Sequence, residues 1–229
     1  MKSSNVVNST PENNDEHLLE IRDCGLADYR EILQIQHILC EKKRQDEIPN
    51  TVLIVEHPAV ITFGARQSRN KLLVSREDLT QRKIDLVNIR RGGGTTAHNP
   101  GQLVFYPILS LKQLKLGISE YVRELEVIGV ELLRQFGVDA ARRKGLPGLW
   151  VEDRKIASIG VRVSKLTTYH GMAINIQNDL AIFDLIVPCG LDNVEMTSVL
   201  KETGKRHSMA HIKKQLAKLL TTHFSASQR

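Results

Sequence analysis

The sequence predicts an α+β fold in which mixed β-sheets are flanked by helices. Two observations support this prediction. Short runs rich in Val, Ile and Phe recur along the chain, as expected of strands, and three longer segments repeat their apolar residues at the spacing of amphipathic helices. The chain has 229 residues, of which 41% are hydrophobic and 25% charged. This is an ordinary composition for a soluble globular protein with a sizeable core.

The sequence predicts seven strands and three helices. Strands are predicted at residues 51–56, 59–63, 84–89, 103–111, 149–151, 155–163 and 169–176. Helices are predicted at about residues 26–45, 119–136 and 208–224. Ser119 should be the N-cap of the second helix and Gly137 should end it, because Ser accepts from the first free N–H groups and Gly tolerates the left-handed conformation at a helix end.

The domain organisation is expected to be simple. Residues 1–16 should form a disordered tail, because they are polar and lack apolar periodicity. Residues 17–229 should form one domain, since no repeat or linker divides them. The tail resembles neither a signal peptide nor a mitochondrial transit peptide, and no run of eighteen uncharged apolar residues predicts a membrane span. Three scattered cysteines fit a reducing cytoplasm better than a disulfide framework.

A glycine-rich run, from Arg90 to Gln102, is the strongest local signal apart from the cysteines. Its three successive glycines would let the backbone approach a ligand closely and present N–H groups to it. The run matches neither GxxxxGK[ST] nor GxGxxG, so it is not a known phosphate loop. The alternative interpretation is a tight loop between strands, with His98 in a turn.

Two further residues are candidates for chemistry. Cys189 lies between Pro188 and Gly190, loop-forming residues that could hold a thiol at the edge of a site. Cys24 and Cys40 are interpreted as small core residues. Strand alternation places Lys155 on a face with apolar residues, where burying an ammonium costs free energy unless it is paired or neutralised.

These residues belong to a set of motifs through which the chain closely resembles the lipoyl(octanoyl) transferases, part of the wider biotin/lipoate protein ligase fold. The resemblance runs from about Leu53 to Gly190. Its motifs are Glu56-His57-Pro58, Thr62-x-Gly64, Arg91-Gly92-Gly93 to His98-x-Pro100-Gly101-Gln102, Pro147-Gly148, Lys155-Ile156, Ser158-x-Gly160, His170-Gly171-x-Ala173-x-Asn175 and Pro188-Cys189-Gly190.

The resemblance implies a catalytic domain that transfers an octanoyl group, without cofactor or metal. The donor would be octanoyl-acyl carrier protein, and the acceptors would be lysines of the lipoyl domains of 2-oxoacid dehydrogenase E2 subunits and of the glycine cleavage H protein. Cys189 would carry the acyl group as a thioester, with Lys155 as its acid/base partner. A monomer is expected. The residues implied to line the acyl pocket are Arg91, Gly92, Gly93, Gly94, Thr95, Thr96, Ala97, His98, Ser158, Ile159, Gly160, Gly171, Met172 and Ala173.

The chemistry accounts for these residue types. A thiolate, not a thiol, must attack the donor thioester, and a nearby ammonium favours the thiolate. A lysine can then return the proton to the leaving group. The sequence departs from the usual family pattern at Ala97, where a tyrosine is common, and at Gly94, where a polar residue is common. Neither change touches Cys189 or Lys155, but both bear on the shape of the pocket.

Two other functions are weighed against acyl transfer. An ATP-dependent lipoate or biotin ligase of the same fold would need an adenylate site and no nucleophilic cysteine, so Cys189 disfavours it. The formal net charge of +6 favours acidic partners such as carrier proteins, nucleic acids or anionic membranes. With only 4% aromatic residues and no basic–aromatic platform, the chain is not expected to bind nucleic acid, and no membrane association is expected.

Overall fold

The computed structural model describes residues 19–188 and 194–225. Within these ranges the main sheet has seven strands, and the first two in the spatial order are the only parallel pair. Its strands, in that order, are β1 (Leu19–Leu26), β2 (Asn50–Glu56), β6 (Gln102–Ile108), β10 (Thr167–Asn175), β9 (Arg154–Ser164), β8 (Leu146–Val151) and β7 (Ala141–Arg143). The mixed α+β class predicted from the sequence is confirmed.

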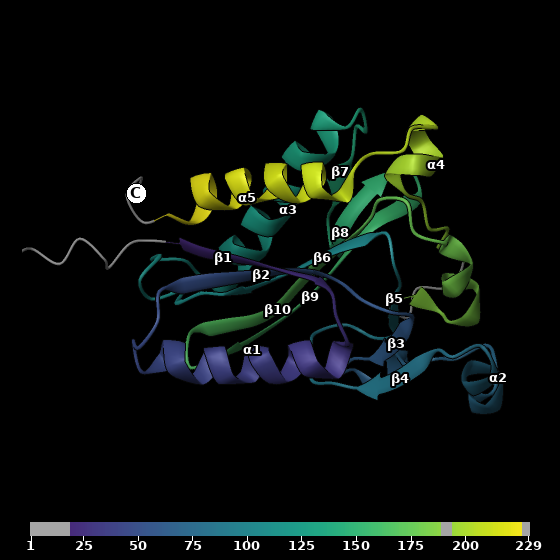
Figure 1. Cartoon of the computed structure of the whole chain (residues 1–229), viewed down its shortest axis with the longest axis horizontal. Coiled ribbons are helices and arrows are strands. Elements are labelled where there is room, and N and C mark those ends of the chain that lie inside the picture. The colour runs from purple at the N-terminus through teal and green to yellow at the C-terminus, as the bar shows by residue number, and fades with distance from the viewer. Residues whose placement is uncertain (1–18, 189–193, 226–229) are drawn as a thin grey trace, which may run out of the picture.

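A second, smaller sheet lies beside one end of the main sheet (Figure 1). Its three strands are β4 (Asp85–Asn88), β3 (Val60–Phe63) and β5 (Thr96–His98), in that order. His98 therefore ends a strand and does not lie in a turn. Because β5 comes directly after the glycine-rich run, this sheet fixes one end of that run.

Helices cover both faces of the main sheet (Figure 1). Helix α1 (Tyr29–Arg44) lies against one face, while α3 (Ile118–Gln135) and α5 (Met209–Phe224) lie against the other. Two short helices, α2 (Arg76–Gln81) and α4 (Val199–Thr203), lie at the periphery. None of the helices in the described ranges is both long and apolar enough to cross a membrane.

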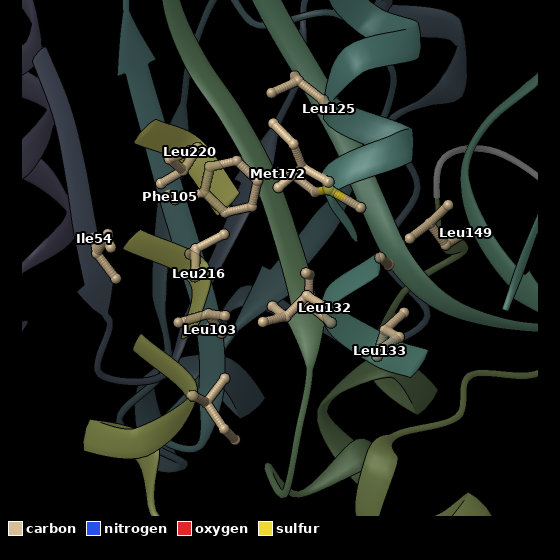
Figure 2. Close-up of a cluster of buried hydrophobic side chains, with 14 of the residues drawn as sticks. Ile54, Leu103, Phe105, Leu125, Leu132, Leu133, Leu149, Met172, Leu216 and Leu220 are labelled. Atoms are coloured by element: carbon tan, nitrogen blue, oxygen red, sulfur yellow. The ribbon is translucent and has the colours of Figure 1, made fainter. Parts of the chain in front are cut away.

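The pleat of the main-sheet strands places apolar side chains in two cores, one on each face of that sheet. In β2, Val52 and Ile54 face α3 and α5, whereas Leu53 and Val55 face α1, as the two-residue period of a strand requires. Figure 2 shows the larger core, where leucines of α3 and α5 meet the sheet. Helix α3 approaches closely at Gly129, since a Cβ there would lie 2.7 Å from the Met172 Cε. The larger core therefore holds α3 tightly against the strands that carry the site.

The three predicted helices and seven predicted strands are present, with one correction. Helix α3 begins at Ile118, and its N-cap is Gly117, not Ser119. The Glu120 carboxylate accepts a hydrogen bond from the Gly117 N–H at 2.7 Å, so a side chain in the first turn replaces the expected serine cap. Gly137 follows the last turn with φ +81°, as predicted. Strands β1, β5 and β7 and helices α2 and α4 were not predicted.

Candidate functional site

Lys155 lies at the start of β9 and is buried, with 2% of its surface exposed. Its Nζ donates a hydrogen bond to the Pro147 carbonyl oxygen at 3.2 Å and lies 5.1 Å from the centre of the Trp150 ring. An ammonium is stabilised by both kinds of neighbour. The pairing of β8 with β9 shifts register between Leu149 and Trp150, which brings Trp150 opposite Lys155.

The Lys155 side chain lines a cavity, named here the Lys155 cavity. Its walls come from the glycine-rich run, from the first turns of α3, from the β7–β8 turn with the start of β8, and from β9. The lining residues are Arg66, Gly92, Gly93, Val122, Gly145, Leu146, Pro147, Lys155, Ile159, Gly160 and Val161. The buried lysine therefore has access to a space that a substrate could enter.

A second cavity, named here the histidine cavity, shares the walls formed by Gly93, Ile159 and Gly160. Its lining residues are Tyr29, Arg91, Gly93, Thr96, His98, Val104, Tyr106, Ser158, Ile159, Gly160, His170, Gly171, Met172 and Ala173. The two cavities are neighbours, so one elongated ligand could occupy both.

The structure brings together most of the residues expected to line an acyl pocket. Ten of them line the histidine cavity: Arg91, Gly93, Thr96, His98, Ser158, Ile159, Gly160, Gly171, Met172 and Ala173. Gly92 lines the Lys155 cavity instead. Gly94, Thr95 and Ala97 line neither of these two cavities and are buried within the run. These three support the loop without facing the space.

The glycine-rich run is held by backbone contacts on both sides. The Gly92 N–H donates to the Val161 carbonyl at 3.0 Å, and the Ala65 N–H donates to the Arg91 carbonyl at 2.9 Å. Gly64 packs so closely that a Cβ would lie 2.2 Å from the Gly93 carbonyl oxygen. Only glycine fits at this position. The run is thus fixed between the end of β3 and the middle of β9.

The Arg91 side chain is buried beside the run and has several polar contacts. Its Nη2 donates to the Thr62 carbonyl at 2.9 Å and to the Thr62 hydroxyl at 2.8 Å, while its Nη1 donates to the Gly92 carbonyl at 3.0 Å. A buried guanidinium needs such acceptors. Arg91 therefore fixes the curvature of the run and supplies positive charge at the wall of the histidine cavity.

One end of the histidine cavity is built from imidazole and phenol rings. Tyr29 stacks on His98 with ring centres 5.6 Å apart, and the His57 Nε2 is 2.9 Å from the Tyr106 hydroxyl. Burial lowers the pKa of His98 and of His170 to about 3, and that of His57 to about 4. These imidazoles are neutral at neutral pH, so this wall is polar but uncharged.

Several lining residues were not anticipated from the sequence as site residues. Tyr29 starts α1 and fits the helical periodicity of a core residue, and Tyr106 lies in a run that reads as strand. Arg66, which lines the Lys155 cavity, lies in a loop without periodicity. Pro147, which also lines that cavity, lies in β8 and was part of a motif but was not assigned to the pocket. His170 was part of a quoted motif but was not assigned to the pocket. Only the packing of distant segments brings these residues together.

Cys189, the expected nucleophile, lies outside the described residues, but both flanking segments contact the site. Before it, the Val187 N–H donates to the Lys71 carbonyl at 3.2 Å, and the Lys71 N–H donates to the Thr95 hydroxyl at 2.9 Å. After it, Glu195 accepts from the Lys155 N–H at 2.8 Å. The described residues before Cys189 are therefore linked through Lys71 to the glycine-rich run, and those after it lie beside Lys155.

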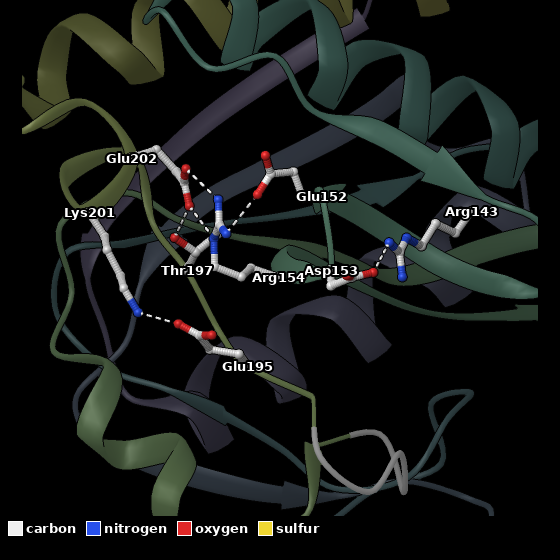
Figure 3. A network of polar contacts seen from close by, with 8 residues as sticks. All are labelled: Arg143, Glu152, Asp153, Arg154, Glu195, Thr197, Lys201 and Glu202. Carbon is white, nitrogen blue, oxygen red and sulfur yellow. Dashed lines mark hydrogen bonds and ion pairs between the residues drawn. The ribbon is translucent and has the colours of Figure 1, made fainter.

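A polar network holds the returning segment against β9 (Figure 3). Arg154 donates to both carboxylate oxygens of Glu202, at 3.0 and 3.1 Å, and Glu202 also accepts from the Thr197 hydroxyl. The hydrogen bond from Arg154 lowers the pKa of Glu202, so the pair is ionised at neutral pH. The network places residues 194–202 next to the start of β9. In the described ranges, no three His, Cys, Asp or Glu side chains are grouped so that they could hold a metal ion.

Comparison with known proteins shows which family the chain resembles. The model of the lipoyl protein ligase A/B catalytic domain matches residues 28–221. The octanoyltransferase of Syntrophobacter fumaroxidans is 42% identical over 193 residues, covering 84% of this chain and 85% of that protein. The mitochondrial octanoyltransferase LIP2 of Arabidopsis thaliana is 39% identical over 209 residues, covering 90% and 89%. A lipoate-protein ligase A solved with bound ATP covers 91% of this chain and 85% of its own, with a TM-score of 0.66 at 16% identity.

Proposed function

The chain belongs to the lipoyl protein ligase A/B catalytic-domain family, with octanoyltransferases among its relatives, and on that premise we propose that it is an octanoyltransferase acting through an acyl-enzyme. It moves an octanoyl group from octanoyl-acyl carrier protein to the lysine amine of a lipoyl domain. The observation that supports this most directly is the buried Lys155, which lines one cavity while a second cavity of suitable chemistry shares its wall.

The octanoyl chain occupies the histidine cavity in this proposal. Its carbonyl carbon lies in the Lys155 cavity, and its methylenes pass the shared wall of Gly93, Ile159 and Gly160. Met172, Val104 and Ala173 supply apolar contact for the chain. Burying the seven carbons beyond the carbonyl at about 0.8 kcal/mol each contributes roughly 5 kcal/mol, enough to select an acyl chain of this length class.

The first half-reaction forms the acyl-enzyme. Cys189 gives its proton to Lys155, and its thiolate attacks the carbonyl carbon of the donor thioester. The carbon–sulfur bond to the carrier breaks, and the carrier thiolate takes the proton from the Lys155 ammonium and leaves as a thiol. The Pro147 carbonyl and the Trp150 ring, which contact the Lys155 Nζ, support the charged form during this step.

The second half-reaction forms the amide. The neutral amine of the acceptor lysine attacks the Cys189 thioester and loses a proton to the neutral Lys155 amine. The carbon–sulfur bond to Cys189 breaks, and Lys155 returns the proton to the Cys189 sulfur. Exchange of one thioester for another is nearly neutral in energy and conversion of a thioester to an amide is favourable, so neither half-reaction needs ATP.

The partners are acidic proteins in this proposal. The lipoyl domains of 2-oxoacid dehydrogenase E2 subunits and the glycine cleavage H protein are the acceptors, and the chain acts in the cytoplasm as a monomer. The formal charge of +6 speeds encounter with such partners more than it tightens the complexes.

Steady-state kinetics with both substrates tests the proposal. Varying octanoyl-acyl carrier protein at several concentrations of an apo lipoyl domain, without ATP, should give parallel double-reciprocal lines, as expected when the first product leaves before the second substrate binds. Transfer that depends on ATP and free octanoate would instead assign the chain to the ligases of the same fold.

A further inference from the structure

One buried carboxylate close to Lys155 has no part in the proposed reaction. Glu126, on the inward side of α3, has 7% of its surface exposed. Its Oε1 accepts a hydrogen bond from the Gly148 N–H at 3.3 Å. A buried carboxylate is costly unless hydrogen-bond donors or a cation compensate it. Its position therefore calls for an explanation beyond packing.

The Gly148 N–H belongs to the same peptide group whose carbonyl contacts Lys155. The Pro147 carbonyl oxygen accepts from the Lys155 Nζ at 3.2 Å, while the Gly148 N–H donates to Glu126. The positive end of the peptide dipole thus faces the carboxylate and its negative end faces the lysine. Glu126 and Lys155 are joined through a single peptide group.

This peptide group lies close to the Lys155 side chain. Gly148 has φ +121°, and a Cβ there would lie 2.3 Å from the Ala157 carbonyl oxygen and 3.0 Å from the Lys155 Cε. Glycine alone combines this backbone conformation with this close approach. The peptide is packed directly on the stem of Lys155, so a change in its orientation must move the lysine.

We infer that Glu126 is a positioning residue for Lys155: its carboxylate fixes the Pro147–Gly148 peptide, and through that peptide holds the lysine head group in the Lys155 cavity. This inference rests on the proposed role of Lys155. It adds Glu126, a side chain that lines neither the Lys155 cavity nor the histidine cavity, to the groups that position Lys155.

The other charged groups near this peptide and Lys155 differ from Glu126 in their exposure or in their ion-pair partners. Arg142 Nη1 lies 3.9 Å from the Glu126 Oε2, but its side chain is 49% exposed, so solvent screens the pair. Arg143 lies over the Trp150 ring and is paired with Asp153. Arg66 lines the Lys155 cavity, and Glu195, whose backbone contacts Lys155, pairs through its carboxylate with Lys201. Glu126 is the buried carboxylate in this set.

The decisive variant is Glu126→Gln, which keeps an oxygen acceptor for Gly148 but removes the charge. We measure the pH dependence of acyl-enzyme formation from a small octanoyl thioester, so that carrier docking plays no part. Without the carboxylate, the ammonium of Lys155 is less favoured, so the alkaline limb of the rate profile should move to lower pH by about one unit. The rate constant should fall while the KM for the small donor stays within twofold.

Two further variants separate positioning from simple structural support. Glu126→Asp retains the charge, so it should restore the alkaline limb even though its shorter side chain lowers the rate. Glu131→Gln removes a charge from the same helix on the side that faces His223 and should leave the profile as in the wild type. Thermal midpoints of all variants establish that each is folded.

The outcomes are distinct. An unshifted alkaline limb in folded Glu126→Gln, with Lys155→Ala strongly impaired, would overturn the inference but leave the proposed function intact. Full activity in Lys155→Ala would remove the proposed function itself. If Glu126→Gln does not fold, Glu126→Asp is the deciding variant. A rate equal to that of the wild type would contradict a role for the contact between the carboxylate and Gly148. A reduced rate with an unshifted alkaline limb would support that role.

Discussion

The backbone of Lys155 is paired with that of Glu195, six positions after Cys189 in the sequence. The Lys155 N–H donates to the Glu195 carbonyl at 2.8 Å, and the Thr197 N–H donates to the Lys155 carbonyl at 2.9 Å. The segment that follows the cysteine is therefore hydrogen-bonded to the strand that carries the lysine. This pairing connects the two residues that the proposed reaction requires to act together.

Loss of the Lys155 amine should abolish most of the activity. Lys155→Ala removes the group that accepts and returns the proton in both half-reactions, so kcat should fall by about 10²- to 10⁴-fold. Lys155→Arg should not rescue it, since a guanidinium does not give up a proton near neutral pH. Single-turnover transfer of radiolabelled octanoyl groups measures the effect, and a loss of less than tenfold in a folded variant would contradict the proposed role.

The wall shared by the two cavities should control entry of the acyl chain. A Cβ at Gly160 would lie 2.8 Å from the Arg91 Cδ and 3.1 Å from the Gly92 carbonyl oxygen, so Gly160→Ala narrows the passage. We expect the KM for the octanoyl donor to rise about tenfold, the cost of roughly 1.4 kcal/mol of binding, and butanoyl donors to be affected less. Gly117→Ala, which adds a methyl group at the start of α3, is the control. Equal effects on both chain lengths would refute the assignment of the histidine cavity to the chain.

Acid should destabilise the fold through the buried imidazoles. The folded-state pKa of His57 is about 4 and those of His98 and His170 are about 3, below an unfolded value of about 6.5. The unfolded chain thus binds more protons between these limits, and stability is lost as the pH falls from about 6.5 toward 4. Three such groups give a slope approaching about 4 kcal/mol per pH unit.

Urea unfolding at several pH values between 7.5 and 4.5 measures that slope. His98→Asn removes one of the three groups, so its midpoint should change less steeply with pH than that of the wild type. His211→Asn, on α5, is the control for the loss of a histidine outside this cluster. Parallel curves for the wild type and His98→Asn would show that this imidazole is not the source of the acid sensitivity.

Basic residues near the Lys155 cavity should speed encounter with an acidic carrier. Arg123 and Lys144 line a hollow that shares Gly145, Leu146 and Pro147 with the Lys155 cavity. Reversing both charges should lower kcat/KM for the carrier-bound donor about tenfold at low salt and much less at high salt. The rate with a small octanoyl thioester should fall much less, although the hollow also includes Glu126 and Pro147, and Lys42→Glu on α1 is the control. An equal loss with both donors would mean that the two substitutions damage the site itself.

The long helices and strands were predictable because their apolar pattern is repeated over many residues. Helices α1, α3 and α5 and the buried strands repeat an apolar pattern over enough residues to be distinctive. Strand β1 was missed because Arg22 and Asp23 interrupt its pattern at the edge of the sheet, and β5 and β7 have three residues each. Helix α2 carried a usable signal, since Ser75 and Asp78 form a capping box.

The candidate site was predictable only in part, for a physical reason. The glycine-rich run, Lys155 and the segments around Ser158 and Gly171 are local motifs, and most of their residues line the two cavities. Tyr29 comes from a helix start, and it stacks on His98 only because α1 packs across the sheet. Tyr106 comes from a buried strand, and its hydroxyl lies beside the His57 ring. Such contacts join residues far apart in the sequence, so the spacing of residues within one segment does not predict them. The buried carboxylate of Glu126 likewise reaches Lys155 only through the β8 backbone.

The central claim is the covalent acyl-enzyme, and intact-protein mass spectrometry tests it most directly. The wild type, Cys189→Ser and Lys155→Ala are incubated with octanoyl-acyl carrier protein and no ATP. The account predicts an octanoyl adduct on the wild type that maps to Cys189, is absent from Cys189→Ser, and moves to an apo lipoyl domain when that is added. Transfer to the lipoyl domain by Cys189→Ser at the wild-type rate, or a requirement for ATP and free octanoate, would contradict it.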